Sequence, residues 1–305
     1  MGMTSTIPFE QHLTRIEAGD TLAPDAIRDL AQDPDILPLG MLADAMRRHL
    51  HGVRTTYVRV AVAGFEASFA DVMADAAREV RITGQPPSLD VAVSAVQAAR
   101  NAAGGRAISG FSWGDIVRWA SVGTPAGRVL RALREAGLDQ LAEIPIDAID
   151  DPELTIGQLL NAGFERLRLT VDKLPAAERI DAFFRVAEWQ RQFGGIVALN
   201  PLPMAMNAFR PTTGYEDVKM VAVARLAAPA VSHVQVDWQR YGPKLAQVAL
   251  TFGADDVDGV SASDDSPEGR RRAPLEEIRR NIQAAGFEPV ERDGRFAIGG
   301  ADGRS

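Results

Sequence analysis

Residues 211–260 restrict the fold most strongly, because a helix-like pattern and a short strand-like run alternate twice within them. The helix-like patterns cover residues 215–228 and 244–252, and each is followed by an apolar run, at 231–236 and at 257–260. Helices and strands that alternate at this spacing are typical of parallel α/β folds. The same alternation continues toward the N-terminus, so the sequence predicts one wound α/β domain.

Eight strand-like runs are expected in all. They cover residues 55–63, 79–83, 106–109, 138–144, 164–171, 196–199, 231–236 and 257–260. Barrels of eight such units occupy roughly 200 to 250 residues. Because no glycine-rich dinucleotide fingerprint follows the first run, a closed barrel is favoured over an open doubly wound sheet. The predicted fold class is therefore an α/β, TIM-like (β/α)8 barrel.

Three regions are expected along the 305 residues. Residues 1–52 read as an N-terminal helical extension, and residues 53–260 form the barrel. Residues 261–305 are expected to supply a linker, a final helix and a short hairpin, because Asp293-Gly294 is a strong hairpin turn signal.

Composition excludes several classes of partner and site. With 33 Lys and Arg against 41 Asp and Glu the net charge is −8, and the one basic cluster, Arg270 to Arg272, reads as a solvated loop rather than a nucleic-acid footprint. No apolar run approaches the ~18 residues of a membrane span, and no signal peptide is visible, so a soluble cytoplasmic protein is expected. The chain has no cysteine, which excludes disulfides, thiolate nucleophiles and cysteine-held clusters.

Polar residues at the predicted carboxyl ends of strands are the candidates for ligand binding, because chemistry in α/β barrels takes place at that face. The candidates are Asp172, Asn200, Arg210, Thr213, Asp237, Tyr241 and Asp258. Arg210 could clamp a carboxylate, although Pro201, Pro203 and Pro211 also fit a loop that is merely stiff. Asp258 fits a pocket or a turn equally well, and the turn is favoured for Asp255 and Asp256.

The histidines do not predict a metal site. His233 lies at the start of an apolar strand with no carboxylate or second histidine at metal spacing nearby, which favours a surface or satisfied side chain. His49 and His51 stand two residues apart, so they point to different sides of a helix. No metal is expected.

Several runs carry a resemblance to a known family. The strongest are VAVARL (residues 221–226), KLAQVALTFGADDVDG (244–259) and FEPVERD (287–293), and GGIVALNPLPM (194–204) is weaker. In this order the chain resembles the radical S-adenosylmethionine (SAM) enzymes of the futalosine route to menaquinone: aminofutalosine synthase and dehypoxanthine futalosine cyclase. The deazaflavin-cofactor synthases are more distant relatives. The resemblance implies a barrel of the radical SAM type.

The departures from this family concern its cofactor. Members follow the first strand with a CxxxCxxC loop that holds a [4Fe-4S] cluster, whereas residues 62–77 read VAGFEASFADVMADAA. Members also have glycines after the fourth strand, where this chain has LAEI and keeps only Glu143. The carboxylates of Glu66 and Asp71 are hard ligands that do not replace three thiolates. No cofactor is therefore expected.

Two functions remain open. The first is a non-catalytic relative that acts as a partner or regulator of an intact radical SAM paralogue, pairs with itself as a dimer, or binds a nucleoside-like small molecule. The second is a cluster-independent lyase or hydrolase that uses Asp172, Asp237 or Asp258. The large side chains after strands one and three are expected to fill one side of the barrel mouth, and an open polar pocket is expected on the side of strands five to eight. The fillers are Phe65, Phe69, Phe111 and Trp113.

Overall fold

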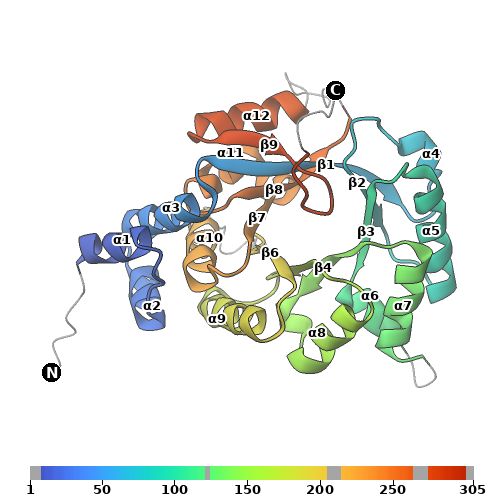
Figure 1. Ribbon diagram of the computed structural model, residues 1–305, viewed down its shortest axis with the longest axis horizontal. Helices are drawn as coiled ribbons and strands as arrows, with labels where there is room; N and C mark the ends of the chain where they lie inside the picture. The colour runs from blue at the N-terminus through green and yellow to red at the C-terminus, as the bar shows by residue number, and fades with distance from the viewer. Residues whose placement is uncertain (1–7, 121–123, 205–213, 264–273, 300–305) are drawn as a thin grey trace, which may run out of the picture.

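A computed structural model describes residues 8–120, 124–204, 214–263 and 274–299. Its centre is a closed parallel barrel in which β1 pairs with both β8 and β2 (Figure 1). The barrel strands are β1 (Arg54–Gly64), β2 (Glu79–Thr83), β3 (Ala107–Ser112), β4 (Gln140–Pro145), β5 (Leu167–Thr170), β6 (Ile196–Asn200), β7 (His233–Asp237) and β8 (Asp256–Ser261). The predicted (β/α)8 barrel is confirmed.

Along each strand, successive side chains point alternately toward the surrounding helices and toward the barrel interior. On β2, Val80 and Ile82 belong to the apolar layer shared with the helices, whereas Glu79 and Arg81 join a polar cluster inside the barrel. Side chains on a strand alternate between its faces, so the pattern of each strand decides what the barrel interior contains. Here that interior contains buried charged side chains, among them Glu79, Arg168 and Asp258.

Helices surround the barrel. Those that follow β1 to β8 are α4 (Phe69–Val72), α5 (Leu89–Ala102), α6 (Trp113–Trp119), α7 (Ala126–Ala136), α8 (Pro152–Asn161), α9 (Ala176–Phe193), α10 (Tyr215–Ala227), α11 (Trp238–Leu250) and α12 (Pro274–Ala284), with a 3-10 turn at Ile146–Ala148. Local signals place several ends: Ser88 caps α5, Ser112 and Asp115 form a capping box on α6, and Gly137 ends α7 with a left-handed φ of 113°. None of the helices in the described ranges is both long and apolar enough to cross a bilayer.

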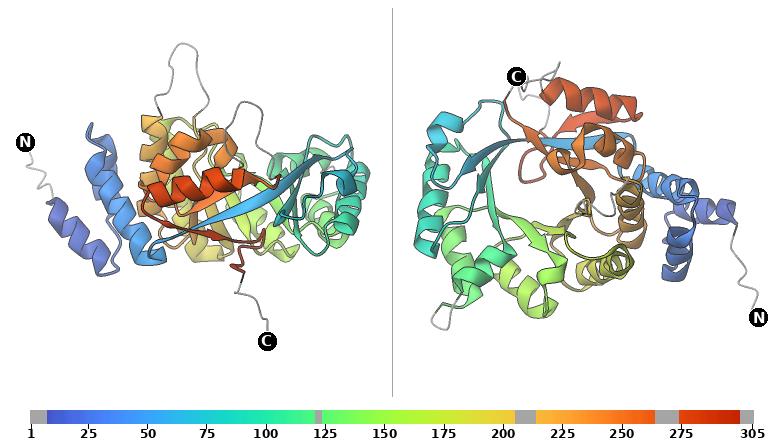
Figure 2. Two further views of the ribbon diagram at one scale, coloured as in Figure 1. Left: turned by 90° about the horizontal axis from the view of Figure 1, so that it is seen from above. Right: turned by 180° about the vertical axis from the view of Figure 1, so that it is seen from behind.

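The N-terminal extension consists of α1 (Phe9–Glu17), α2 (Pro24–Gln32) and α3 (Leu37–His51). Figure 2 shows that α3 lies against the barrel and that α1 and α2 lie outside it. A Cβ on Gly40 of α3 would lie 2.6 Å from the ring of Phe252, so only glycine permits this close packing. α10 is buried along residues 217–227 because α3 covers one side of it and α9 another.

The C-terminal segment lies at the end of the barrel where the strands begin. β9 (Glu288–Glu291) pairs in parallel with the start of β1, and the turn after it crosses the barrel opening (Figure 1). The expected hairpin is present as a single antiparallel bridge between Arg292 and Ile298. The amide of Gly294 donates to the carbonyl of Arg78 at 3.1 Å, and Gln140 Nε2 donates to the carbonyl of Gly294 at 2.7 Å. These bonds fix the turn against β2 and β4.

Candidate functional site

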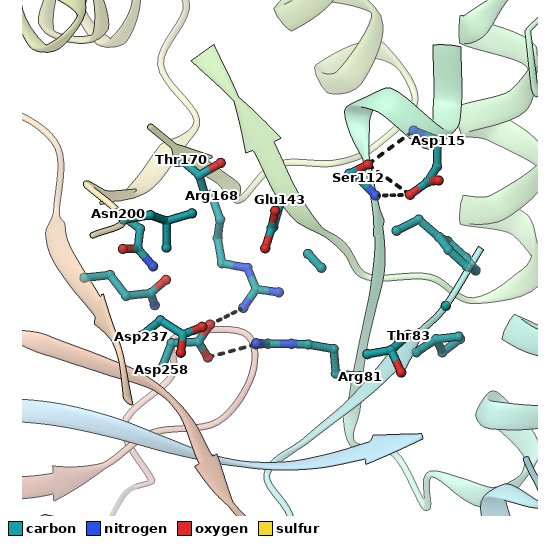
Figure 3. A pocket seen from close by; sticks show the side chains of 16 residues that line it. Arg81, Thr83, Ser112, Asp115, Glu143, Arg168, Thr170, Asn200, Asp237 and Asp258 are labelled. Carbon is teal, nitrogen blue, oxygen red and sulfur yellow. Dashed lines mark hydrogen bonds and ion pairs between the residues drawn. The ribbon is translucent and has the colours of Figure 1, made fainter. Parts of the chain in front are cut away.

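A polar pocket of about 230 Å³ lies at the carboxyl ends of the strands (Figure 3). Its walls come from β2 through β8 and from the start of α6. The polar residues that line it are Arg81, Thr83, Ser112, Asp115, Glu143, Arg168, Thr170, Asn200, Gln235, Asp237 and Asp258. The volume is below the ~300 Å³ at which drug-sized sites begin, so the pocket suits a small polar molecule or one part of a larger molecule.

Two arginines and two carboxylates form the floor of the pocket. Arg81 Nη2 lies 2.6 Å from Glu79 Oε1 and 2.8 Å from Asp258 Oδ1, and Figure 3 shows Arg81 and Arg168 both directed toward Asp258. Arg168 Nη2 lies 3.3 Å from Glu79 Oε1, and its Nη1 lies 3.7 Å from Asp258 Oδ2. Ser109 adds a 2.5 Å hydrogen bond to Glu79. The four charges cancel, which a buried cluster requires.

The electrostatics of this floor favour ionised carboxylates. Burial alone would raise the pKa of Asp258, but the charges of Arg81 and Arg168 outweigh burial and hold that pKa well below its usual range. The pKa of Glu79 is likewise lowered, because Arg168 and Arg81 overcome the effect of its complete burial. The floor therefore carries fixed charges over the neutral pH range.

Asp237 lies beside this floor, and the pKa of its carboxyl group is shifted in the opposite direction. Burial, and then the charge of Asp258, raise the pKa of its carboxyl group above the ordinary value. One oxygen, Oδ1, caps α11 by accepting hydrogen bonds from the amides of Gln239 and Arg240, both at 2.9 Å. Asp237 and Asp258 are register partners on neighbouring strands, so two carboxyl groups whose pKa values move in opposite directions border one pocket.

Several polar atoms around the pocket are buried without a hydrogen-bond partner in the described part of the chain. Three of them, Arg168 Nε, Thr170 Oγ1 and Asn200 Oδ1, belong to residues that line the pocket. A fourth, Glu79 Oε2, lies in the charged floor beneath. More than ~90% of buried polar groups in proteins are hydrogen-bonded, so four unsatisfied atoms at one place indicate a site built for a polar ligand or ordered water.

The structure places the seven predicted residues differently. Asn200, Asp237 and Asp258 line the pocket together. Tyr241 is buried, its hydroxyl donates to the carbonyl of Pro201, and burial raises its pKa. Asp172 is not among the lining residues, and its carbonyl accepts a hydrogen bond from Arg179 at 2.8 Å. Arg210 and Thr213 lie outside the described residues.

Sequence reasoning missed the residues at the centre of the site. Arg81, Arg168, Thr170 and Gln235 lie within strands rather than at the loops that follow them. A signal is present, because EVRIT and LRLT place an arginine between apolar residues on strands of a predicted barrel, whose strands are covered by helices. A charge at an inward position of a buried strand requires a partner.

Of the aromatic side chains expected to fill one side of the barrel mouth, only some lie at this pocket. Phe69 and Trp113 are buried, Phe65 is partly buried against the core, and Phe111 lines the pocket itself. The opening therefore extends from β2 and β3 across to β8, rather than along β5 to β8 alone.

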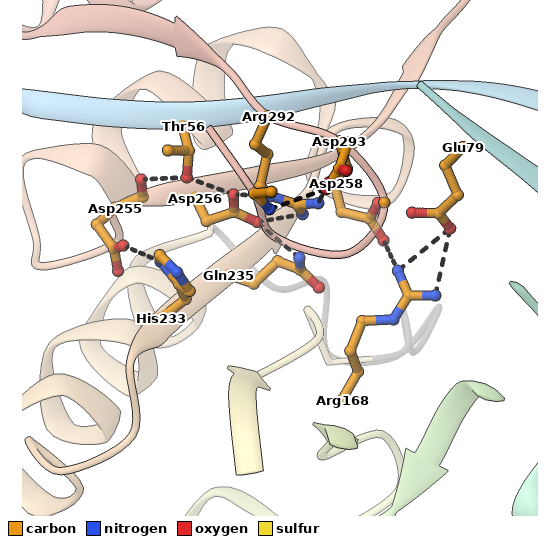
Figure 4. Close-up of polar contacts among 12 residues, drawn as sticks. Thr56, Glu79, Arg168, His233, Gln235, Asp255, Asp256, Asp258, Arg292 and Asp293 are labelled. Carbon is orange, nitrogen blue, oxygen red and sulfur yellow. Dashed lines mark hydrogen bonds and ion pairs between the residues drawn. The ribbon is translucent and has the colours of Figure 1, made fainter. Parts of the chain in front are cut away.

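A second charged layer lies below the pocket (Figure 4). Arg292 forms two hydrogen bonds with Asp256, at 2.6 and 2.8 Å, and both side chains are fully buried. Thr56 and Gln235 also donate to Asp256, at 2.5 and 2.7 Å. Asp256 thus binds the C-terminal turn inside the barrel.

Asp255 lies in a separate network with two histidines. His233 Nδ1 lies 2.6 Å from Asp255 Oδ2, so His233 is a satisfied side chain as expected, and Arg225 binds the other carboxylate oxygen. The fold also brings His51 Nε2 within 3.5 Å of Asp255, a proximity that sequence spacing does not show. The three side chains could hold a metal by distance, but Arg225 already neutralises the carboxylate and Arg47 is close enough to feel its charge. The group is therefore read as an ion-pair network.

The residues after β1 do not fit an iron–sulfur cluster. The segment contains α4, whose Phe69 is buried, and it provides oxygen donors such as Glu66 and Asp71 but no sulfur. Oxygen donors are poorly matched to such a cluster, which is bound by cysteine thiolates.

Comparison with known sequences points to one group of enzymes. The sequence-family model that describes the C-terminal region of the CofH/MqnC proteins matches residues 200–300 of this chain. The "5-amino-6-(D-ribitylamino)uracil--L-tyrosine 4-hydroxyphenyl transferase" of Archaeoglobus fulgidus is 29% identical over 241 residues, which are 69% of this chain and 70% of that protein. The "aminodeoxyfutalosine synthase" of Thermus thermophilus is 30% identical over 212 residues, and the match covers 56% of this chain and 55% of the synthase. The chain thus spans little more than half of the synthase.

Comparison with solved structures supports the barrel. Methylornithine synthase (PylB) superposes with a TM-score of 0.64 over 92% of this chain and 97% of that chain, at 15% identity. The FeFe-hydrogenase maturase HydG from Carboxydothermus hydrogenoformans gives 0.64 over 92% of this chain and 79% of its own, at 13% identity. At these identities the likeness concerns the fold alone.

Proposed function

Because this chain is a cysteine-free homologue of the CofH/MqnC enzymes, we propose that it binds a nucleoside-like small molecule at the barrel mouth without radical chemistry. Two facts support the absence of radical chemistry: the chain has no thiolate, and oxygen donors stand where the family holds its cluster. The barrel and the pocket at its mouth remain.

The unsatisfied polar atoms carry the proposal. Arg168 Nε offers a donor, Asn200 Oδ1 offers an acceptor, and Thr170 Oγ1 can serve as either. A ligand with hydroxyl groups matches this mixture, because each hydroxyl both donates and accepts. The name of one relative includes a ribityl chain on a uracil, so a polyhydroxylated chain on a heterocycle fits both the pocket and the family.

Charge also favours a neutral or cationic ligand over an anion. Arg81 and Arg168 are already paired with Glu79 and Asp258. The wall adds three more carboxyl groups, those of Asp237, of Glu143, which is paired with Arg240, and of Asp115, which is paired with Arg118. An added carboxylate would meet acidic neighbours and would have to compete for paired arginines. A nucleoside-like molecule avoids both costs.

Calorimetry with a matched pair of variants tests the proposal. Adenosine and 5-amino-6-(D-ribitylamino)uracil are titrated into the protein and into Thr170→Val, which removes an unsatisfied hydroxyl and keeps the shape. We expect at least one compound to bind, and the variant to bind it roughly 3- to 10-fold more weakly, with stability unchanged or raised. Thr251→Val, on the surface at the end of α11, is the control.

Absence of heat with all compounds at millimolar concentration would overturn the proposed nucleoside-like ligand. A protein partner, an intact radical SAM paralogue or a second copy of this chain, would then be the remaining role. Light scattering of the protein alone and mixed with that paralogue would measure it.

A second candidate function rests on Asp237 and Asp258. A carboxyl group with a raised pKa beside one with a lowered pKa is the arrangement that general acid and base chemistry uses. We propose hydrolase or lyase activity on the bound ligand as this alternative. Mass spectrometry of each ligand after incubation would detect turnover, and Asp237→Asn, which keeps the cap on α11, should abolish turnover while binding persists.

A further inference from the structure

A cavity of about 340 Å³ lies at the opposite end of the barrel from the pocket described above. It is bordered by the amino ends of β2 and β3 and by the turn that follows β9. Three arginines and the carboxylate of Asp293 line it, and two of the arginines also contact carboxylates outside the lining, Arg78 with Glu291 and Arg295 with Asp139. The charged and glycine residues of its lining are Arg78, Arg106, Arg295, Asp293, Gly104 and Gly105.

Arg106 is the fixed cation of this cavity. Its Nε, Nη1 and Nη2 donate to the carbonyls of Ala77, Ala103 and Asp75 at 2.8, 3.0 and 3.1 Å. Within the described ranges no carboxylate lies within ion-pair distance of it. Three neutral acceptors therefore hold the guanidinium in place without cancelling its charge, and two of its five N–H donors remain.

Arg78 and Arg295 add charge and donors from two other elements. Arg78 contacts Glu291 through Nε at 3.3 Å, its side chain is 44% exposed, and its two terminal amino groups remain available. Arg295 donates through Nε and Nη2 to Asp139, at 3.2 to 3.4 Å, and through Nη1 to the carbonyl of Gly105 at 3.1 Å. Arg295 is thus held by Asp139, whereas the guanidinium of Arg78 is held only through Nε in the described part of the chain.

Gly104 and Gly105 provide backbone donors. Both adopt left-handed conformations, with φ of 57° and 87°, and neither amide has an acceptor in the described part of the chain. A Cβ on Gly105 would meet nothing within 4 Å, so the space beside this backbone is open. Free amides beside fixed guanidinium groups are the donors that anion sites use.

We propose that this cavity binds a tetrahedral oxyanion: inorganic phosphate, or the phosphoryl group of a small phosphate ester. Phosphate offers several acceptor oxygens, which match converging guanidinium forks and amides better than a spherical halide does. The anion joins β2, β3 and the C-terminal turn and balances the charge of Arg106, which has only carbonyl acceptors. This site is independent of the nucleoside-like ligand at the barrel mouth.

Thermal unfolding and calorimetry test the proposal on the whole chain. Inorganic phosphate and ribose 5-phosphate are compared with ribose and with chloride at the same ionic strength. We expect both phosphates to raise Tm and to bind, and ribose and chloride to have no effect. Tighter binding of inorganic phosphate identifies the free ion as the ligand, and tighter binding of the ester identifies a phosphorylated small molecule.

Variants locate the site. Arg78→Gln should weaken phosphate binding roughly 3- to 10-fold, and Arg78→Lys should restore part of the loss because the charge remains. Arg185→Gln, an exposed position on α9, makes the same charge change elsewhere and should leave the affinity unaltered. Equal effects of phosphate and chloride, or an equal loss in Arg185→Gln, would overturn the proposal. So would loss of phosphate binding in Asn200→Ala, which would place the anion at the barrel mouth.

Discussion

Removing the charge of Arg292 should destabilise the protein more than any surface substitution. Arg292 and Asp256 are both fully buried and share two hydrogen bonds. Arg292→Met leaves the Asp256 carboxylate charged and without its partner, which costs about 3–5 kcal/mol for a buried pair. The remaining bonds from Thr56 and Gln235 are too few to replace a guanidinium.

The expected fall in Tm follows from chain length. With an unfolding entropy of ~2.1 cal/mol/K per residue, 305 residues give about 0.64 kcal/mol per degree. A loss of 3–5 kcal/mol then lowers Tm by about 5–8 °C. Calorimetry measures this shift, which should change little with added salt because the pair is screened from solvent.

Two controls separate this reasoning from a general effect of losing an arginine. Arg191→Met breaks an exposed pair with Glu188, whose side chains are 74% and 53% exposed, and should lower Tm by less than about 1 °C. Arg292→Met combined with Asp256→Asn removes both charges and should recover at least half of the loss. If the double variant is no more stable than the single one, the buried charge is not the cause.

Three further predictions concern packing and pH. Gly40→Ala should lower the free energy of unfolding by about 1–3 kcal/mol, because the added Cβ meets the ring of Phe252. Gly157→Ala on α8 is the control: its Cβ meets nothing within 4 Å, so urea titration should find it neutral or slightly stabilising. The pKa of Asp258 is lower in the folded state than in the unfolded state, so its ionised carboxylate stabilises the fold above the unfolded pKa of ~3.9. This stabilisation should be lost as the pH falls below that value, and Asp258→Asn should make stability less dependent on pH in this range. The folded pKa of His233 is raised by Asp255, so its contribution is present below pH ~6.5 and should disappear as pH rises further, as NMR titration of the ring and unfolding curves would show.

The order of the strands could be predicted from the sequence because apolar runs and turn signals alternate regularly. The run 79–83 coincides with β2, and the run 164–171 contains the shorter β5. Lengths differ because strand ends depend on the register of neighbours, which one sequence does not contain. The closed barrel could be predicted because eight strand-and-helix units are present and no dinucleotide fingerprint follows the first strand.

The candidate site could be predicted mostly at its rim. Asn200 and Asp237 end their strands, where a barrel places its chemistry, and Asp258, within β8, is the one predicted residue that lies in the floor. The role of Arg168 could not be assigned because its partners, Glu79 and Asp258, become its neighbours only when the barrel closes, and the contact of Arg81 with Asp258 depends on closure in the same way. The contact of His51 with Asp255 was hidden for the same reason.

The runs that carry the resemblance are joined physically by buried ion pairs. Arg225 of VAVARL binds Asp255 of GADDVDG, and the adjacent Asp256 binds Arg292 of FEPVERD. These three runs thus tie α10, β8 and the C-terminal turn together around one end of the barrel. Changing one member of such a pair leaves an uncompensated buried charge, so the runs are constrained by folding and not only by chemistry. A chain without the thiolates of the family can keep these runs because they hold the barrel together below the pocket.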